Sequence, residues 1–209
     1  MHYFIIYKPY LVLSQFSAVE GKETLANYFD VPKDVYPVGR LDFDSEGLLI
    51  LTNDKRLNHR LLNPQFNHER EYWAQVDGAV TKKALQEIQQ GVIINVDGKQ
   101  YHTMPCKATL FDNIPIVPER YPSIRFRKEI PAPWIKLVLN EGKNRQVRKM
   151  TASIGFPTLR LIRNRIEKIV LGDLQPGKMI SLDEKIIYNK LFGTRPEPPL
   201  PQGKQRKLN

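Results

Sequence analysis

The segment from Gly39 to Leu49, GRLDFDSEGLL, contains the residues that look most suited to chemistry. Asp42 places a carboxylate two positions after a guanidinium, on a stretch that connects two apolar runs. The runs Val35–Val38 and Leu48–Thr52 have the length and composition of strands. A carboxylate on a loop held between strands is well placed to act on a bound substrate. We therefore expect the chemistry of this protein to begin at Asp42.

A second dense segment, EGKNRQVRKM, runs from Glu141 to Met150. Its spacing predicts a helix capped by Asn144 and ended by Gly155 and Pro157. Side chains three and four positions apart share a helix face. The apolar face would carry Val147, Met150, Thr151 and Ile154, and a neighbouring basic face Arg145, Arg148 and Lys149. The basic face would lie near a helix N-terminus, which attracts anions; the alternative is an ordinary solvated basic face.

Both segments resemble signatures of one family, the pseudouridine synthases that act on small- and large-subunit ribosomal RNA. The first matches G-R-L-D-x-x-S-E-G-L-L without a gap, and the second matches E-G-[RK]-x-R-Q-[IV]-R-[RK]-M. Ile6–Tyr10 is similar to the opening K-P segment of the family. The resemblance implies that Asp42 is the catalytic aspartate and that Arg148 is the basic residue paired with it.

Two further segments carry the resemblance. Tyr72 stands in a strand pattern similar to the K-x-Y motif of the family, with Arg70 where lysine is usual. The resemblance implies that Tyr72 packs against the target base. The segment 156–166 looks like the last motif, in which an apolar residue lines the pocket and arginines face RNA. That motif implies a pocket wall at Leu161 or Ile162, while Glu167 replaces a usual glycine.

The function implied by the resemblance is the isomerisation of a specific uridine to pseudouridine in large-subunit (23S) ribosomal RNA. Asp42 would act as nucleophile or base on a flipped-out nucleotide, and the sequence does not choose between a covalent ester and a glycal. No cofactor and no metal are implied. The expected partner is ribosomal RNA or an assembling ribosomal particle, bound by a monomer. The expected RNA contacts are Arg40, Arg70, Lys143, Arg145, Lys149, Arg160 and Arg163.

Two other functions compete with this interpretation. A metal-dependent hydrolase would use the acidic spacing of Asp42, Asp44 and Glu46, but the twelfth position of that loop is Asn53 rather than a bidentate glutamate. A non-catalytic RNA-binding or ribosome-assembly protein would use the basic surface alone. The Asp42–Arg148 pair argues against it, because a carboxylate beside bound phosphates is unfavourable unless it acts.

Composition agrees with an RNA partner. The 209 residues include 32 Lys and Arg against 22 Asp and Glu, a formal charge of +10 that favours a polyanion. The single Cys106 excludes an internal disulfide and fits a reducing compartment. We find no signal-peptide pattern and no apolar stretch long enough to span a bilayer. The sequence therefore predicts a cytoplasmic protein without a membrane partner.

The strand and helix patterns of the sequence predict an α+β fold, with a mainly antiparallel mixed sheet and short flanking helices. These elements must position the candidate residues. Such a sheet is the pseudouridine synthase catalytic fold that the resemblance implies, here expected without the S4 domain that many relatives carry. Strand patterns fall near 3–7, 35–38, 48–52, 71–77, 92–96, 104–111, 134–139 and 178–182. Helical patterns fall at 22–29, 54–62 and 81–90 and after Asn144.

We expect residues 1–190 to form the catalytic domain, either as one body or as two sub-lobes flanking a central cleft. Residues 191–209 form a Pro-rich basic tail that should be disordered. The Pro-rich stretch 112–133 interleaves basic and aromatic residues and is too long for a simple connection. Its composition suits RNA, although a solvated basic loop is equally compatible.

Overall fold

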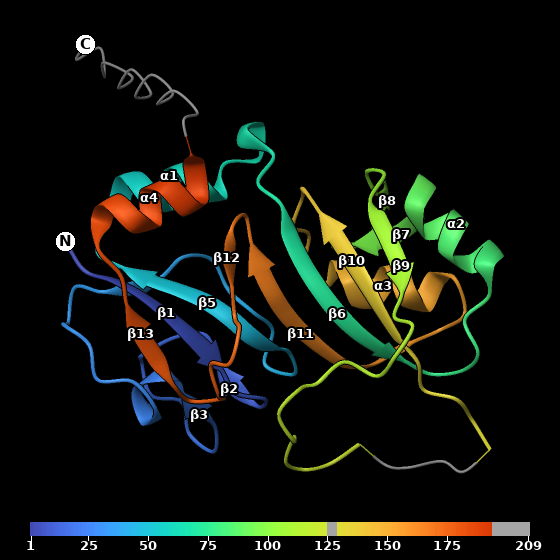
Figure 1. Ribbon diagram of the computed structural model, residues 1–209, viewed down its shortest axis with the longest axis horizontal. Helices are drawn as coiled ribbons and strands as arrows, with labels where there is room; N and C mark the ends of the chain where they lie inside the picture. Colours follow the sequence, from blue (N-terminus) through green and yellow to red (C-terminus); the bar gives the residue numbers. More distant parts are fainter. Residues whose placement is uncertain (125–128, 194–209) are drawn as a thin grey trace.

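A computed structural model describes residues 1–124 and 129–193 of the chain. Its centre is one mixed sheet, antiparallel at each junction except that between β5 and β11 (Figure 1). The strand order is β13 (Met179–Ser181), β1 (Tyr3–Lys8), β5 (Glu46–Thr52), β11 (Thr158–Ile166), β6 (Arg70–Val76), β10 (Trp134–Leu139) and β9 (Lys107–Leu110). Short strands extend it, β12 (Ile169–Val170) beside β11 and β4 (Tyr36–Pro37) beside β5. The expected α+β class is confirmed.

Two small sheets accompany the main one. They pair β2 (Val12–Leu13) with β3 (Glu23–Thr24), and β7 (Ile93–Val96) with β8 (Lys99–His102). β8 was not predicted, because its residues Lys-Gln-Tyr-His lack the apolar alternation that marks a strand. The helix expected at 22–29 is wrong: β3 and a 3-10 turn at Leu25–Asn27 occupy that stretch.

The other predicted helices are confirmed, with one addition. The four α-helices are α1 (Lys55–Leu62), α2 (Lys82–Gln90), α3 (Gln146–Ser153) and α4 (Glu184–Phe192). The Asp54 side chain caps α1 by accepting from two backbone N–H groups, and Thr81 caps α2. α4 was not predicted, and it corrects the expected tail boundary, because its last residues, Leu191 and Phe192, are buried in the core. The remainder of the predicted tail, 194–209, lies outside the described residues.

The core divides along the sheet. At one end α1 and α4 lie together, and at the other end α2 and α3 lie beside the β7–β8 hairpin (Figure 1). Consecutive residues of β11 serve the two cores, because strand side chains alternate between faces. Ile162 packs into the cluster that includes α1 and α4, and Leu161 into the cluster that includes α2 and α3.

The parallel contact between β5 and β11 positions the loop that carries Asp42. Gly47 of β5 lies opposite Arg163 of β11, and a Cβ atom on Gly47 would stand 2.4 Å from the Arg163 carbonyl oxygen. The φ of Gly47, +111°, also disfavours other residues. Glycine therefore lets β11 approach the start of β5, directly after the acidic loop.

The Pro-rich stretch joins β9 to β10. Its described parts, 112–124 and 129–133, contain no helix or strand, and residues 125–128 lie outside the described chain. The Arg120 guanidinium stacks 4.1 Å above the Tyr10 ring and so ties the stretch to the start of the chain. Among the described residues, no helix has both the length and the apolar character needed to cross a bilayer.

Candidate active site

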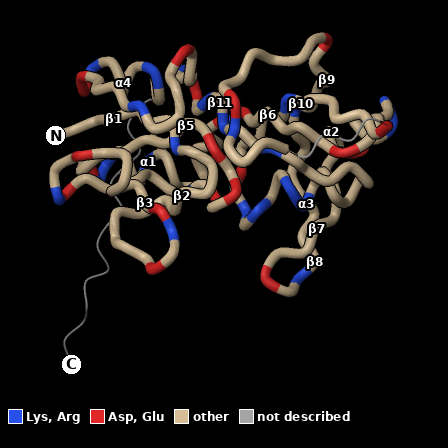
Figure 2. The backbone as a smooth tube through the Cα atoms, turned by 90° about the horizontal axis from the view of Figure 1, so that it is seen from below, with Lys and Arg blue, Asp and Glu red and all other residues tan. Residues whose placement is uncertain are grey.

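A cavity of about 590 Å³ opens where β5, β6 and β11 meet the loop before α3. Its lining includes most of the predicted site residues: Arg40, Asp42, Arg70, Tyr72, Lys143, Arg145, Leu161 and Arg163. These residues are far apart in sequence and come together because β5, β11 and β6 are neighbours in the sheet. Acidic and basic positions lie side by side in this central region (Figure 2).

Asp42 lines this cavity and makes one long ionic contact among the described residues. Its side chain is 33 % exposed, and its Oδ2 lies 3.8 Å from Nη1 of Arg145. The same guanidinium donates two hydrogen bonds of 2.8 Å to Asp44. Asp42 is thus held near a positive charge without being enclosed by it, and one side of the carboxylate faces the cavity.

The expected ion pair between Asp42 and Arg148 is replaced by a different one. Nε of Arg148 lies 3.3 Å from Oδ2 of Asp44, and its terminal nitrogens donate to the backbone oxygens of Asp44 and Thr158. Arg148 does not line the cavity, whereas Arg145 does. The guanidinium nearest to Asp42 is therefore that of Arg145, and Arg148 holds the neighbouring turn through Asp44.

The start of α3 explains why Arg145 reaches the acidic loop. Arg145, rather than the predicted Asn144, is the N-cap residue, with φ 54° and ψ 33°. This left-handed conformation is uncommon for arginine and recurs at functional sites. The spacing predicted that Arg145 and Arg148 share a helix face. Because Arg145 lies outside the helical conformation, that prediction is wrong. The predicted apolar face is confirmed, since Val147, Met150 and Thr151 are buried.

Burial and charge act in opposite directions on the titratable groups of this cluster. Burial would raise the pKa of Asp44, but the hydrogen bonds from Arg145 and the charge of Arg148 hold that pKa below its usual range. Burial lowers the pKa of Arg148, and the carboxylates oppose that effect. Asp44 thus makes the closer ion pairs with both arginines. Asp42, with its longer contact, remains available to a ligand.

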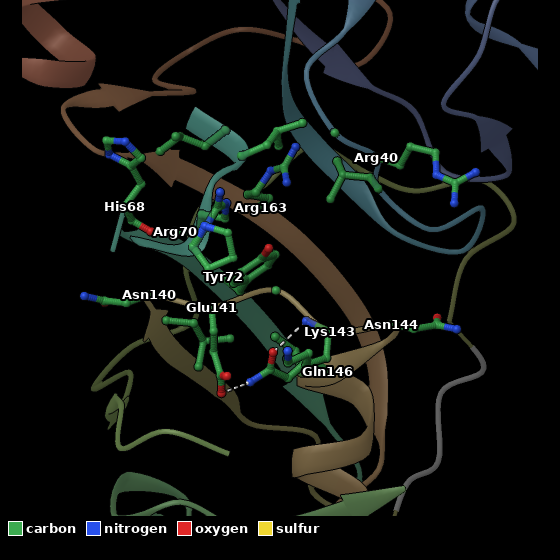
Figure 3. A pocket seen from close by; sticks show the side chains of 18 of the residues that line it. Arg40, His68, Arg70, Tyr72, Asn140, Glu141, Lys143, Asn144, Gln146 and Arg163 are labelled. Carbon is green, nitrogen blue, oxygen red and sulfur yellow. Dashed lines mark hydrogen bonds between the residues drawn. The ribbon is translucent and has the colours of Figure 1, made fainter. Parts of the chain in front are cut away.

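The opposite wall of the cavity combines an aromatic ring with two guanidinium groups (Figure 3). Tyr72, half-buried on β6, lies across from Arg163 of β11 in the sheet register. Arg70 donates to the carbonyls of His68 and Leu61, and burial lowers the pKa of its guanidinium. Nε of Arg163 donates to the Leu48 carbonyl at 2.8 Å. This wall is cationic, and its arginines are held by carbonyl oxygens rather than by carboxylates.

Three of the predicted assignments need correction. Arg160 is 6 % exposed and donates to both carboxylate oxygens of Glu46, at 2.7 and 2.9 Å, so it is a buried structural residue rather than an RNA contact. Ile162 packs in the other core and does not line the cavity, whereas Leu161 does. Lys149 is half-buried on α3 and does not line the cavity.

The far side of the cavity is built around Glu141, to which the sequence assigned no role. This carboxylate is 8 % exposed and accepts hydrogen bonds from the Tyr101 hydroxyl, the Met104 backbone N–H and the Gln146 side chain. The Lys143 ammonium lies 4.7 Å above the Tyr101 ring. Tyr101 belongs to the unpredicted strand β8, so the pairing could not be inferred without that hairpin.

The acidic loop does not assemble a metal site. Within residues 1–124 and 129–193 no group of three or more His, Cys, Asp or Glu side chains is placed to hold a metal ion. Glu46, which the calcium-loop interpretation needs, faces Arg160 on the other side of the sheet from the cavity. The metal-dependent alternative thus finds no support in this geometry.

Comparison with known proteins agrees with the motifs. The family described as RNA pseudouridylate synthase matches residues 2–153. The chain is 50 % identical over 174 residues to the ribosomal large subunit pseudouridine synthase E of Vibrio parahaemolyticus, covering 83 % of this chain and 71 % of that protein. It is 47 % identical to the protein of the same name from Xanthomonas axonopodis pv. citri, with coverages of 82 % and 89 %.

Comparison of structures leads to the same family. A crystal structure of a pseudouridylate synthase superimposes with a TM-score of 0.72 at 25 % identity, covering 91 % of this chain and 73 % of the other. The family matches most of the chain, and one relative is 50 % identical in sequence over 174 residues. These two findings are sufficient to assign the chain to the family. The chain belongs to the RNA pseudouridylate synthase family and is an RNA pseudouridine synthase, an isomerase.

Proposed function

We propose that this enzyme converts a uridine of large-subunit ribosomal RNA to pseudouridine and that Asp42 is the group that reacts at the ribose. The observation that carries the proposal is the position of Asp42 in a cavity shared with Tyr72, while Asp44 takes the closer guanidinium contacts. The names of the most similar relatives support the choice of large-subunit RNA. Residues 1–192 would form the catalytic unit, since the last residues of α4 belong to its core. It would act as a cytoplasmic monomer on free RNA or on an assembling particle.

The reaction breaks the bond between ribose C1′ and uracil N1, turns the base while it stays bound, and joins C1′ to C5. C5 then loses its proton and N1 gains one, so the product is an isomer of the original nucleotide. A single carboxylate is sufficient, because the departing base remains in the cavity and needs no second acid of the kind that glycosidases use. Asp42 either attacks C1′ to form an ester or removes a ribose proton on the way to a glycal.

Arg145 would support Asp42 electrostatically during this chemistry. A carboxylate enclosed with a nucleotide loses hydration, and a nearby guanidinium offsets part of that cost. Arg145 lies 3.8 Å from Asp42 and can come closer when substrate displaces solvent. Arg148 would contribute indirectly, by holding Asp44 and the turn that carries Asp42.

Tyr72 would receive the target base once the nucleotide leaves its stack. Extrusion costs a few kcal/mol, and stacking on an aromatic ring returns about 1 to 3 kcal/mol per base. A cavity of about 590 Å³ is large enough for a nucleoside. Arg40 and Lys143, exposed at the rim, would bind the flanking phosphates, so affinity should fall steeply with salt.

The test is release of tritium from large-subunit ribosomal RNA transcribed with 5-tritiated uridine. Asp42→Asn should reduce the single-turnover rate at least about 10³-fold, because the amide keeps the shape of the carboxylate but is neither nucleophile nor base. Asp173→Asn is the matched control, since Asp173 is exposed and does not line the cavity. Release by Asp42→Asn at the normal rate would remove Asp42 from the reaction. No release by the unaltered protein from any ribosomal RNA that it binds would favour a non-catalytic RNA-binding protein.

A further inference from the structure

The buried polar groups without partners gather at one place in the described chain. The unpaired buried side-chain atoms are Ser45 Oγ, Arg148 Nε and Arg163 Nη2. Arg148 still has the Asp44 carboxylate at 3.3 Å, so its charge is compensated. Ser45 and Arg163 have no such compensation, and both line the cavity. Since buried polar groups are normally paired, a concentration of unpaired donors indicates where a ligand supplies the acceptors.

Ser45 and Arg163 belong to the same wall. Ser45 directly precedes β5, and the register places Arg163 opposite Gly47, two residues further along that strand. Their side chains are almost fully buried, with 1 % and 5 % of the residue exposed. Gly47 contributes no side chain between them. The Ser45 hydroxyl and the Arg163 guanidinium therefore form a pair of donors at the inner end of the cavity.

The position of this pair suits a base better than a phosphate. Tyr72, the proposed platform for the base, is the direct cross-strand neighbour of Arg163. Such neighbours lie about 5 Å apart at Cβ, so a base against the Tyr72 ring would lie within reach of the guanidinium. A phosphate would remain at the rim, where exposed cations are available. Arg40, at the edge of the close-up, points away from the Tyr72 and Arg163 pair (Figure 3).

We infer that Arg163 and Ser45 bind the carbonyl oxygens of the target uracil and stabilise the negative charge that the base acquires. The inference rests on the proposed function. When C1′–N1 breaks, the electron pair passes to N1 and is shared with the two carbonyl oxygens. Asp42 meanwhile either bonds to C1′ as an ester or removes a ribose proton to give the glycal. Rejoining at C5 returns that charge to the new C1′–C5 bond. Donors fixed in a buried site then favour the separated state without moving.

Substitution of the leaving base tests this role directly. Arg163→Gln should lower the single-turnover rate on uridine RNA by about 10²- to 10³-fold, the usual cost of losing one such donor. Ser45→Ala should cost about tenfold, because a neutral hydroxyl stabilises an anion less than a guanidinium does. The target position is first mapped with the unaltered protein. Both variants are then assayed on the same RNA carrying 5-fluorouridine, by following the loss of the original nucleotide with nuclease digestion and mass spectrometry.

Fluorine withdraws electrons and stabilises the departing base, so the enzyme has less charge left to stabilise. The loss caused by Arg163→Gln should therefore be several-fold smaller on 5-fluorouridine than on uridine. A purely structural role would give equal losses on both substrates and would overturn the inference. If Arg163 instead binds a phosphate, the plot of log affinity against log salt should be less steep for Arg163→Gln than for the unaltered protein, by about 1. This result would also overturn the inference.

The controls separate this inference from the proposed function. Arg165→Gln removes the same charge from the same strand, but from a side chain that pairs with Glu69 and Glu71 and does not line the cavity. It should change neither rate nor substrate dependence. If Arg163→Gln does not fold, the loss of rate caused by Ser45→Ala on the two substrates provides the same test. An inactive unaltered protein refutes the proposed function, whereas an active one with variants as fast as itself refutes only the role of Ser45 and Arg163.

Discussion

The junction of β5 and β11 carries ionic groups on both of its faces, and the two faces differ in how completely those groups are paired. On one face Arg160 and Glu46 form a buried pair, closed further by hydrogen bonds from the Tyr7 hydroxyl and to the Pro118 carbonyl. On the cavity face Asp42 keeps a contact of only 3.8 Å. Arg163, on that same face, has a terminal nitrogen without a partner.

The contrast shows that burial alone does not separate structural from functional arginines. Arg160 and Arg163 are both about 95 % buried, with 6 % and 5 % of the residue exposed. What differs is whether the protein supplies all the acceptors. The closed pair on the Arg160 face leaves nothing for a ligand to bind, whereas the open arrangement on the cavity face leaves donors and a carboxylate free to react. Breaking each face in turn should therefore affect different properties.

The largest effect on folding should come from the closed face. Arg160→Met leaves Glu46 buried and unpaired, which costs about 3 to 5 kcal/mol. For a chain of this size that loss lowers the melting temperature by on the order of 10 °C, measured by circular dichroism. The double variant with Glu46→Leu should recover most of the loss, because it removes the stranded charge.

The opposite result for Arg160 would restore the interpretation from the sequence. An Arg160→Met protein that melts at the normal temperature but binds RNA more weakly, with a smaller salt slope, would show that Arg160 faces RNA. RNA affinity measured on the folded fraction at several salt concentrations distinguishes these outcomes. A neutral effect on both properties would contradict the closed pair as a source of stability.

The open face should instead respond in rate. Arg145→Gln should reduce single-turnover activity about 100-fold, equivalent to about 2.7 kcal/mol, because Asp42 loses its nearest positive charge. Its melting temperature should change little, since exposed ion pairs contribute at most about 1 kcal/mol. Arg148→Gln provides the comparison. If Arg148→Gln costs more activity than Arg145→Gln while the fold is intact, Arg148 is the working partner of Asp42, as the family motif implied.

Much of the framework could be predicted from the sequence, because local signals and tertiary structure agree there. Asp54 and Thr81 begin helices where a capping side chain precedes an amphipathic run. The apolar runs of β1, β5 and β10 became central strands. The predicted strands also omitted β11, which lies between β5 and β6 in the sheet. The short polar strand β8 and the helix α4 lacked such signals, and packing of distant segments determines them. The strand order brings the motif residues to one cavity, which no single segment reveals.

The site could be predicted in its residue types but not in its pairings. Whether an arginine of β11 points to the cavity depends on register shifts, which fall between Thr158 and Arg160 and between Arg163 and Arg165. Bulges of this kind change the alternation that a strand pattern assumes. The left-handed Arg145 likewise has no signal in its side chain, and this conformation gives Asp42 a different partner from the one expected. Which charged side chains pair in the site depends on the backbone geometry of a few residues. The motifs specify only the types of residue that are present.

The smallest expected effect concerns Asp44, whose partly exposed pairing is intermediate between the two faces. Hydrogen bonds from Arg145 and the charge of Arg148 outweigh burial and hold its pKa below the ordinary value of 3.8. Because the native state binds the proton less readily than the unfolded chain, ionised Asp44 stabilises the fold above about pH 4, and the contribution disappears as the pH falls through the native pKa. Asp44→Asn should therefore be less stable than the unaltered protein by at most about 1 kcal/mol at pH 7, and this difference in the free energy of unfolding should narrow below about pH 4.

Urea unfolding across this pH range measures the difference. The control is Asp173→Asn, at an exposed carboxylate without a described ion pair, which is expected to show no narrowing. A difference for Asp44→Asn that stays constant down to pH 2 would mean that its ion pairs with Arg145 and Arg148 do not stabilise the native state, and that the acidic loop is held by its backbone contacts alone.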